Sequence, residues 1–197
     1  GLPVAGGNGQ ENGDDVIVLG DGDDRGDGEL GNDIFIDGAG DDRYSGDDGF
    51  DWVVFGRDVS SREINLSAVA PINPQANLII GDTFDANTEA VSGTRFNDFI
   101  LGDSRADLQP TLVGVAINPL DNRLTQDKFA QISGLFSTNE DLDGALINNT
   151  LLARADLFTG AAGARALSFG NILLGGGGAD SIQGNGGNDI IDGDLEL

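Results

Sequence analysis

Residues 13–54 read GDDVIVLGD, GDDRGDGEL, GNDIFIDGA, GDDRYSGDD and GFDWVV, and this stretch decides the fold. Each unit begins with Gly, and an Asp follows two residues later. Five Asp residues therefore recur at intervals of nine: Asp15, Asp24, Asp33, Asp42 and Asp51. In most units a bulky apolar or aromatic residue stands two positions after the Asp. Each unit is typical of a Gly-rich turn followed by a short strand.

The spacing of nine predicts a flattened coil. A strand of about three residues and a turn of about six make half a circuit, so that two units complete one coil. Coils stacked at about 4.8 Å place Asp15, Asp33 and Asp51 in one column and Asp24 and Asp42 in another. Neighbouring carboxylates then repel by roughly 1 kcal/mol in water and about 3–4 kcal/mol at an effective dielectric near 20. A cation between the coils is expected to reverse that repulsion.

Composition restricts the cation and the partners. The 197 residues include 34 acidic and 10 basic side chains, a formal charge of −24, and no Cys, Met or His. This charge argues against nucleic acid and against insertion in an anionic membrane. Thiolate sites, imidazole sites and a Ser-His-Asp apparatus need residues that the chain lacks. Oxygen ligands remain, and they favour several Ca²⁺ ions, which take six to eight oxygens each.

The predicted ligands are the Asp side chains in register and the carbonyls of the Gly-rich turns, because Gly can curve tightly enough to present its carbonyl. The Asp residues are Asp15, Asp24, Asp33, Asp42, Asp51, Asp98, Asp180 and Asp189, and the Gly residues are Gly13, Gly20, Gly22, Gly31, Gly38, Gly40, Gly49, Gly176, Gly178 and Gly187. Folding is expected to depend on metal, because a Gly-rich chain loses much entropy on ordering and the small apolar ladder buries little surface.

Four segments follow from the pattern. Residues 1–58 form the first repeat block, and 59–103 form a β extension that ends in one imperfect repeat with Asp98. Residues 104–170 are predicted to be a small helical insert, because apolar residues between Leu124 and Phe136 have near-helical spacing. The repeat returns in 171–197 with Asp180 and Asp189. Two repeats are too few to bury a core, so we expect 171–197 to pack on the same solenoid.

These units resemble a known family. GDGDD (20–24), GELGND (28–33), GAGDD (38–42), GGGGAD (175–180) and GNGGND (184–189) are similar to the GGxGxDxUx nonapeptide of RTX, or haemolysin-type, calcium-binding proteins. The resemblance implies a mainly β fold, a right-handed parallel β-roll that here would carry the α-helical insert. It also implies type I export from a Gram-negative bacterium, folding on external Ca²⁺, and a stabilising role in a larger secreted protein.

A narrower resemblance involves three segments. SGTRFND (92–98), LTQDKFAQISGL (124–135) and GNILLGG (170–176) are similar to RTX regions attached to animal-type haem peroxidases of bacteria. A proximal His for haem is absent from this chain, so such chemistry would belong to the rest of the parent protein. The sequence starts without Met, and we expect it to be a non-catalytic piece of a larger polypeptide.

Other interpretations stay open at this point. In an adhesion or carbohydrate-binding domain, Ca²⁺ would also bridge to an extracellular glycan or surface ligand. Residues 25–27 spell RGD, a tripeptide known from integrin recognition, which arises readily by accident in a chain rich in Gly and Asp. An acidic disordered linker is a further alternative, but the strict period of nine argues against it. Paired acids such as Asp41 and Asp42 could act in catalysis, yet no cleft signal accompanies them.

Overall fold

The computed structural model describes residues 13–47, 49–66, 82–84, 88–103, 171–186 and 189–194. In these ranges the chain forms short strands: β1 (Val16–Val18), β2 (Arg25–Asp27), β3 (Ile34–Ile36), β4 (Arg43–Ser45), β5 (Trp52–Val54), β6 (Glu63–Asn65), β7 (Thr83–Phe84), β8 (Ala90–Ser92), β9 (Phe99–Leu101), β10 (Ile172–Leu174), β11 (Ser181–Gln183) and β12 (Ile190–Asp192). The described ranges include no helix long and apolar enough to cross a membrane. The predicted helical insert at 104–170 lies outside them.

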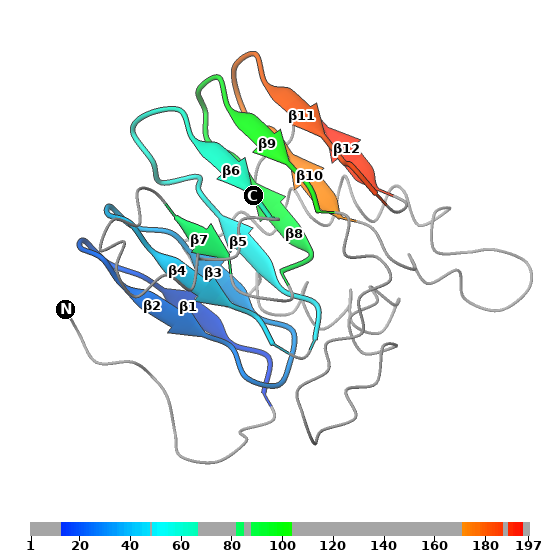
Figure 1. Cartoon of the computed structure of the whole chain (residues 1–197). Helices are drawn as coiled ribbons and strands as arrows, with labels where there is room; N and C mark the ends of the chain where they lie inside the picture. Colours follow the sequence, from blue (N-terminus) through cyan, green and yellow to red (C-terminus); the bar gives the residue numbers. More distant parts are fainter. Residues whose placement is uncertain are drawn as a thin grey trace, which may run out of the picture.

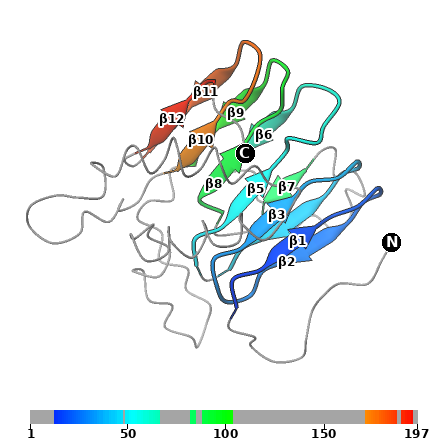
Figure 2. The ribbon, with the colours of Figure 1, turned by 180° about the vertical axis from the view of Figure 1, so that it is seen from behind.

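All the strand pairs are parallel. A six-stranded sheet has the order β1-β3-β5-β8-β10-β12, and two three-stranded sheets have the orders β2-β4-β7 and β11-β9-β6. In the repeat block the register shifts by 18 residues per coil, since Val16 pairs with Ile34 and Ile34 pairs with Trp52. The strands follow one another from β1 and β2 at one end to β11 and β12 at the other (Figures 1 and 2). The predicted parallel β-roll architecture is confirmed for the described residues.

Segments far apart in the sequence are neighbours in the sheets. Strand β10 pairs with β8, and β11 pairs with β9, so the repeats after residue 170 continue the coils that precede residue 104. One strand departs from the simple order, because β7 pairs with β4 whereas β6, which comes before it in the chain, pairs with β9. Strand β7 is thus an additional rung beside β4.

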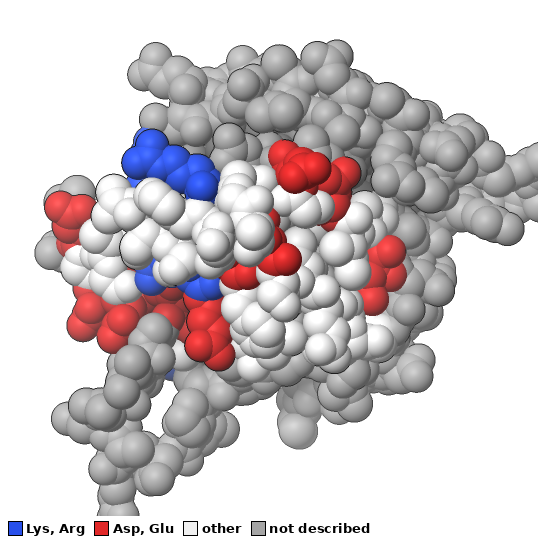
Figure 3. Space-filling view, turned by 90° about the horizontal axis from the view of Figure 1, so that it is seen from above, with Lys and Arg blue, Asp and Glu red and all other residues white. Residues whose placement is uncertain are grey.

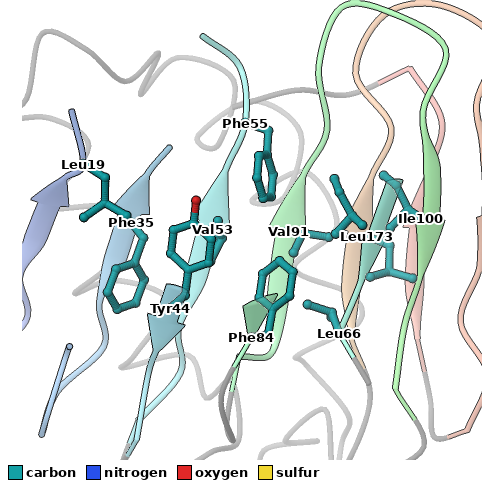
Figure 4. Close-up of a cluster of buried hydrophobic side chains, with 11 residues drawn as sticks. Leu19, Phe35, Tyr44, Val53, Phe55, Leu66, Phe84, Val91, Ile100 and Leu173 are labelled. Atoms are coloured by element: carbon teal, nitrogen blue, oxygen red, sulfur yellow. The ribbon is translucent and has the colours of Figure 1, made fainter. Parts of the chain in front are cut away.

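Much of the core is a ladder formed by the central residues of successive strands. Phe35, Val53, Val91 and Leu173 stand opposite one another in successive strands of the six-stranded sheet and are fully buried. Tyr44 packs among three aromatic rings, with its ring centroid 5.4 Å from that of Phe84. Figure 4 shows these side chains pointing into the space between the strands. Burying each such side chain contributes about 1.5–3 kcal/mol.

The two sides of the roll differ in burial. All three residues are buried in β3, β5, β8 and β10, whereas β6, β9 and β11 begin with exposed residues. The sequence reflects this difference, since IFI, WVV and ILL are apolar throughout while EIN and SIQ alternate. The turns that join the sheets lie at the two edges of the roll, and the Asp residues of the repeats stand at the ends of those turns.

Candidate metal centre

The Asp residues of alternate units are stacked by hydrogen bonds. The backbone N–H of Asp15 donates to Oδ1 of Asp33 at 2.8 Å, and the N–H of Asp33 donates to Oδ1 of Asp51 at 2.9 Å. At the opposite edge, the N–H of Asp24 donates to Oδ1 of Asp42 at 2.8 Å. One oxygen of each accepting carboxylate therefore accepts a hydrogen bond from a backbone N–H of the preceding coil.

The same contact recurs beyond the first repeat block. The N–H of Asp98 donates to Oδ1 of Asp180 at 2.8 Å, and the N–H of Asn171 donates to Oδ1 of Asp189 at 2.9 Å. The structure thus brings the predicted Asp residues together in two edge columns. Asp15, at the outer end of its column, has an exposed side chain.

Sequence reasoning missed three members of these columns. Asp82 accepts the N–H of Asp42 at 2.9 Å, and Glu89 accepts the N–H of Asp51 at 2.9 Å. Asn171 takes the equivalent place one coil further on. A signal was present, because each of these residues directly precedes a strand, as the Asp residues of the repeats do. Their spacing from the neighbouring units is irregular, so a search for a period of nine does not find them.

The second carboxylate oxygen is the candidate ligand. Among the described residues, no hydrogen-bond donor reaches the buried Oδ2 of Asp33, Asp42 or Asp180. An unsatisfied buried carboxylate oxygen is costly, and structures normally pair such atoms. The free oxygens therefore fit a hard cation such as Ca²⁺, which binds carboxylates and carbonyls.

These oxygens lie against the turns, and they can do so only because the turns contain Gly. A Cβ on Gly28 would overlap Oδ2 of Asp33, and a Cβ on Gly175 would overlap Oδ2 of Asp180. Both glycines stand five residues before their Asp, at the first position of the nonapeptide. In each unit the carboxylate oxygen thus packs against the backbone at the start of its own turn, where a Cβ would not fit.

The predicted Gly residues bring backbone carbonyls close to the same turns. Gly49 has φ of 152°, and a Cβ there would collide with the carbonyl of Gly31 on the preceding coil. The same approach recurs at four more of the predicted glycines: Gly31 lies on the carbonyl of Gly13, Gly38 on that of Gly20, Gly40 on that of Gly22, and Gly178 on that of Phe96. A Cβ on Gly13, Gly20 or Gly22 would meet no carbonyl within 4 Å. Gly176 has φ of 89°, and Gly187 lies outside the described residues.

Asp98 differs from the other predicted ligands. Its Oδ2 accepts the backbone N–H of Thr94 at 2.6 Å, and the Thr94 hydroxyl lies 3.0 Å from both of its oxygens. Its Oδ1 also accepts the N–H of Arg62 at 2.7 Å. The imperfect repeat thus satisfies its carboxylate with protein donors, and the geometry favours Asp33, Asp42 and Asp180 over Asp98 as ligands.

Burial makes the ionised form of the column carboxylates unfavourable without a cation. Loss of hydration raises the pKa of Asp33 to about 7. Burial likewise raises the pKa of Asp42 and of Asp189. A divalent ion beside these groups would favour the ionised form and lower the pKa. The electrostatics therefore agree with the free oxygens in indicating a cation.

Acidic side chains gather in several patches on one face of the described surface, whereas basic ones occupy fewer places (Figure 3).

The RGD tripeptide forms strand β2, in which the Arg25 guanidinium pairs with its neighbour Asp27 at 3.2 Å. The aromatic residues Tyr44 and Trp52 are buried. These placements give adhesion through RGD, and sugar stacking on either ring, no geometric support.

A family model for the RTX calcium-binding nonapeptide repeat matches residues 11–35, 19–53 and 166–195. Comparison with curated proteins and with solved structures finds no match. The likeness to peroxidase-attached regions is untested by these findings and stays a prediction. The matched residues include most of the column Asp residues and the turns that leave their oxygens free. The residues that match this model therefore carry RTX calcium-binding nonapeptide repeats.

Proposed function

We propose that the chain is a calcium-driven folding and stabilising module of a larger secreted bacterial protein, with no catalytic role of its own. The observation that carries this proposal is the set of buried carboxylate oxygens that lack a hydrogen-bond donor among the described residues, at Asp33, Asp42 and Asp180. Ca²⁺ would be held by these oxygens and by turn carbonyls, and it supplies the positive charge that the columns lack.

The columns explain why folding would follow Ca²⁺. Without it, the folded state must bury carboxylates and hold like charges in register along each edge column. An ion that binds only the folded state raises stability with its concentration. Sites formed by turns of successive coils do not exist in the unfolded chain, so the free energy of binding contributes to folding.

Calcium affinity links this behaviour to secretion. RTX repeat proteins are typically secreted by bacteria. Extracellular calcium modules bind with Kd of about 10⁻⁴–10⁻³ M, which would leave the chain unfolded at low intracellular Ca²⁺ and folded outside. The proposal therefore assigns the module to the extracellular space, where it would stabilise the polypeptide to which it is joined.

Circular dichroism of the whole chain tests the proposal. The far-UV signal is expected to change from disordered to β on addition of Ca²⁺, the thermal midpoint is expected to rise with Ca²⁺ concentration, and a chelator is expected to reverse both. Mg²⁺ at equal ionic strength is the control, because its strict octahedral geometry suits these sites poorly. Equal signals and midpoints with Ca²⁺ and with chelator would refute the proposal.

A further inference from the structure

The extra rung β7 brings a third carboxylate to the turn at residues 37–42. Asp82 precedes β7 and lies beside β4, which Asp42 precedes. Asp37, Asp42 and Asp82 each offer one oxygen, and these oxygens lie within 4.8 Å of one another. That separation is about twice a Ca²⁺–oxygen distance of about 2.4 Å, so one ion can contact all three.

Asp37 makes this turn different from the others. It stands five residues before Asp42, at the position that Gly28 and Gly175 occupy in their units. Asp37 thus places a second carboxylate beside that of Asp42. Asp37 is completely buried, and the hydroxyl of Tyr44 donates a hydrogen bond to its Oδ1.

One cation of the protein already lies at this cluster and does not satisfy it. Arg62 pairs with Asp37 at 3.2 Å and with Asp82 at 3.1 Å, and its Nε contacts Asp58. In the described part of the chain, three carboxylates thus pair with one guanidinium. Among the described residues, Asp42 forms no ion pair with Arg62, and its Oδ2 is the buried oxygen that no donor there reaches.

The electrostatics of the group agree with a missing positive charge. Burial raises the pKa of Asp37 to about 9, although the hydrogen bond from Tyr44 opposes the shift. Burial also raises the pKa of Asp82 and Asp42. Two outcomes would relieve this situation: a proton shared between Asp37 and Asp42, or a bound cation.

We propose that Asp37, Asp42 and Asp82 hold a divalent cation, Ca²⁺ by the chemistry of its ligands, beside the guanidinium of Arg62. This site goes beyond the repeat sites, because Asp82 lies outside the residues that match the RTX repeat and Asp37 replaces a turn Gly. The ion fastens the inserted rung β7 to the roll. The ion and the Arg62 guanidinium together carry +3 against −4 for Asp37, Asp42, Asp58 and Asp82, so the ion removes most of the excess negative charge. The free oxygen of Asp42 gains a partner.

Counting ions on the whole chain tests the site. Equilibrium dialysis at saturating Ca²⁺, with metal measured by mass spectrometry, is expected to give one ion fewer for Asp82→Asn than for the wild type. The Asn keeps an oxygen that accepts the N–H of Asp42 while losing the charge. Asp58→Asn is the matched control, since it removes a partner of Arg62 without removing a proposed ligand. Its ion count is expected to equal that of the wild type.

An unchanged count for Asp82→Asn would overturn the site and favour the shared proton. If Asp82→Asn does not fold in Ca²⁺, anomalous diffraction from wild-type crystals grown with Ca²⁺ shows whether an ion occupies the site. A peak among Asp37, Asp42 and Asp82 supports the proposal, and peaks in the repeat columns without one there overturn it. A wild type that binds no Ca²⁺ overturns both this site and the proposed function.

Discussion

At Asp33, the two oxygens of one carboxylate have different environments. Oδ1 accepts the N–H of Asp15, while Oδ2 faces Gly28 and has no donor among the described residues. The spacing of nine predicted that these Asp residues would be stacked. It did not predict the hydrogen bond, because the contact depends on how far successive coils are offset. The carboxylate therefore links the coils directly through one atom and is left to bind a cation through the other.

This division predicts opposite effects of Asp33→Asn with and without Ca²⁺. The Asn retains an oxygen for the Asp15 amide and removes the buried charge. With chelator, the residual β signal is expected to rise slightly, because the ionised Asp33 is disfavoured by burial. In Ca²⁺, the apparent affinity is expected to fall by about tenfold or more, the equivalent of about 1.4 kcal/mol. Calcium titration followed by circular dichroism measures both effects.

Asp23→Asn is the control for that comparison. Asp23 is exposed, and its Oδ1 accepts the N–H of Asp41 at 3.2 Å, a contact that Asn can also make. Its calcium affinity is expected to stay within about twofold of the wild type. If Asp33→Asn and Asp23→Asn behaved alike, the buried oxygen of Asp33 would have no special role.

The buried carboxylates also predict a pH dependence of the metal-free protein. Burial raises the pKa of Asp33 to about 7 and that of Asp37 to about 9, from an ordinary 3.8. A raised pKa means that the folded state binds the proton more tightly than the unfolded state. These groups therefore stabilise the metal-free fold fully below the ordinary value and lose that contribution as the pH rises through 7 and then 9.

The chelated chain should accordingly show a larger residual β signal in far-UV circular dichroism at about pH 5 than at about pH 8. In Ca²⁺ the order should reverse, because protons compete with the ion for the same oxygens. A metal-free stability that increased between these two pH values would contradict the assigned burial of these carboxylates.

At the scale of the turn and its strand, two glycines provide a matched pair. Gly49 has φ of 152°, and a Cβ there would strike the carbonyl of Gly31. Gly20 belongs to an equivalent turn, and nothing lies within 4 Å of a Cβ placed on it. Gly49→Ala is expected to lower the free energy of unfolding in Ca²⁺ by at least about 2 kcal/mol. Gly20→Ala should change it by less than about 1 kcal/mol. Similar losses for both variants would disprove the close stacking of the turns.

The inward ladder provides a second pair. Leu173 and Ile191 stand opposite each other in β10 and β12, but Leu173 is fully buried and Ile191 is 45% exposed at the end of the roll. Leu173→Ala should cost about 2–5 kcal/mol of unfolding free energy, because it leaves a cavity. Ile191→Ala should cost much less. Denaturant unfolding in Ca²⁺ measures both, and an equal cost would contradict the placement of the core.

Sequence reasoning predicted the strands of the repeats better than the junction between them. The strands from β1 to β5 followed from the period of nine, and β9, β11 and β12 followed from Asp98, Asp180 and Asp189. The rung β7 did not, because residues 59–89 have no period and its pairing with β4 is set by long-range packing. Asp37 and Asp82 were missed as possible ligands for the same reason, since neither occupies the repeat position of a predicted Asp.

For the whole molecule, charge and fold are coupled. The formal charge of −24 would oppose compaction if it lay at random, yet part of it is arranged in columns where one ion can bridge two coils. The strand pairs β8–β10 and β9–β11 join segments about 80 residues apart. The account therefore predicts that loss of Ca²⁺ weakens both ends of the roll, although the ends belong to distant parts of the sequence.

Amide hydrogen exchange of the whole chain, measured by mass spectrometry in Ca²⁺ and after chelation, tests the coupling of ion binding to folding most directly. In Ca²⁺ the strands within residues 16–54 and 172–192 should be protected, because their amides bond to the neighbouring coils. After chelation, peptides from both ranges should exchange as fast as unfolded chain. Equal protection in the two conditions would show that the columns hold together without metal and would contradict the account.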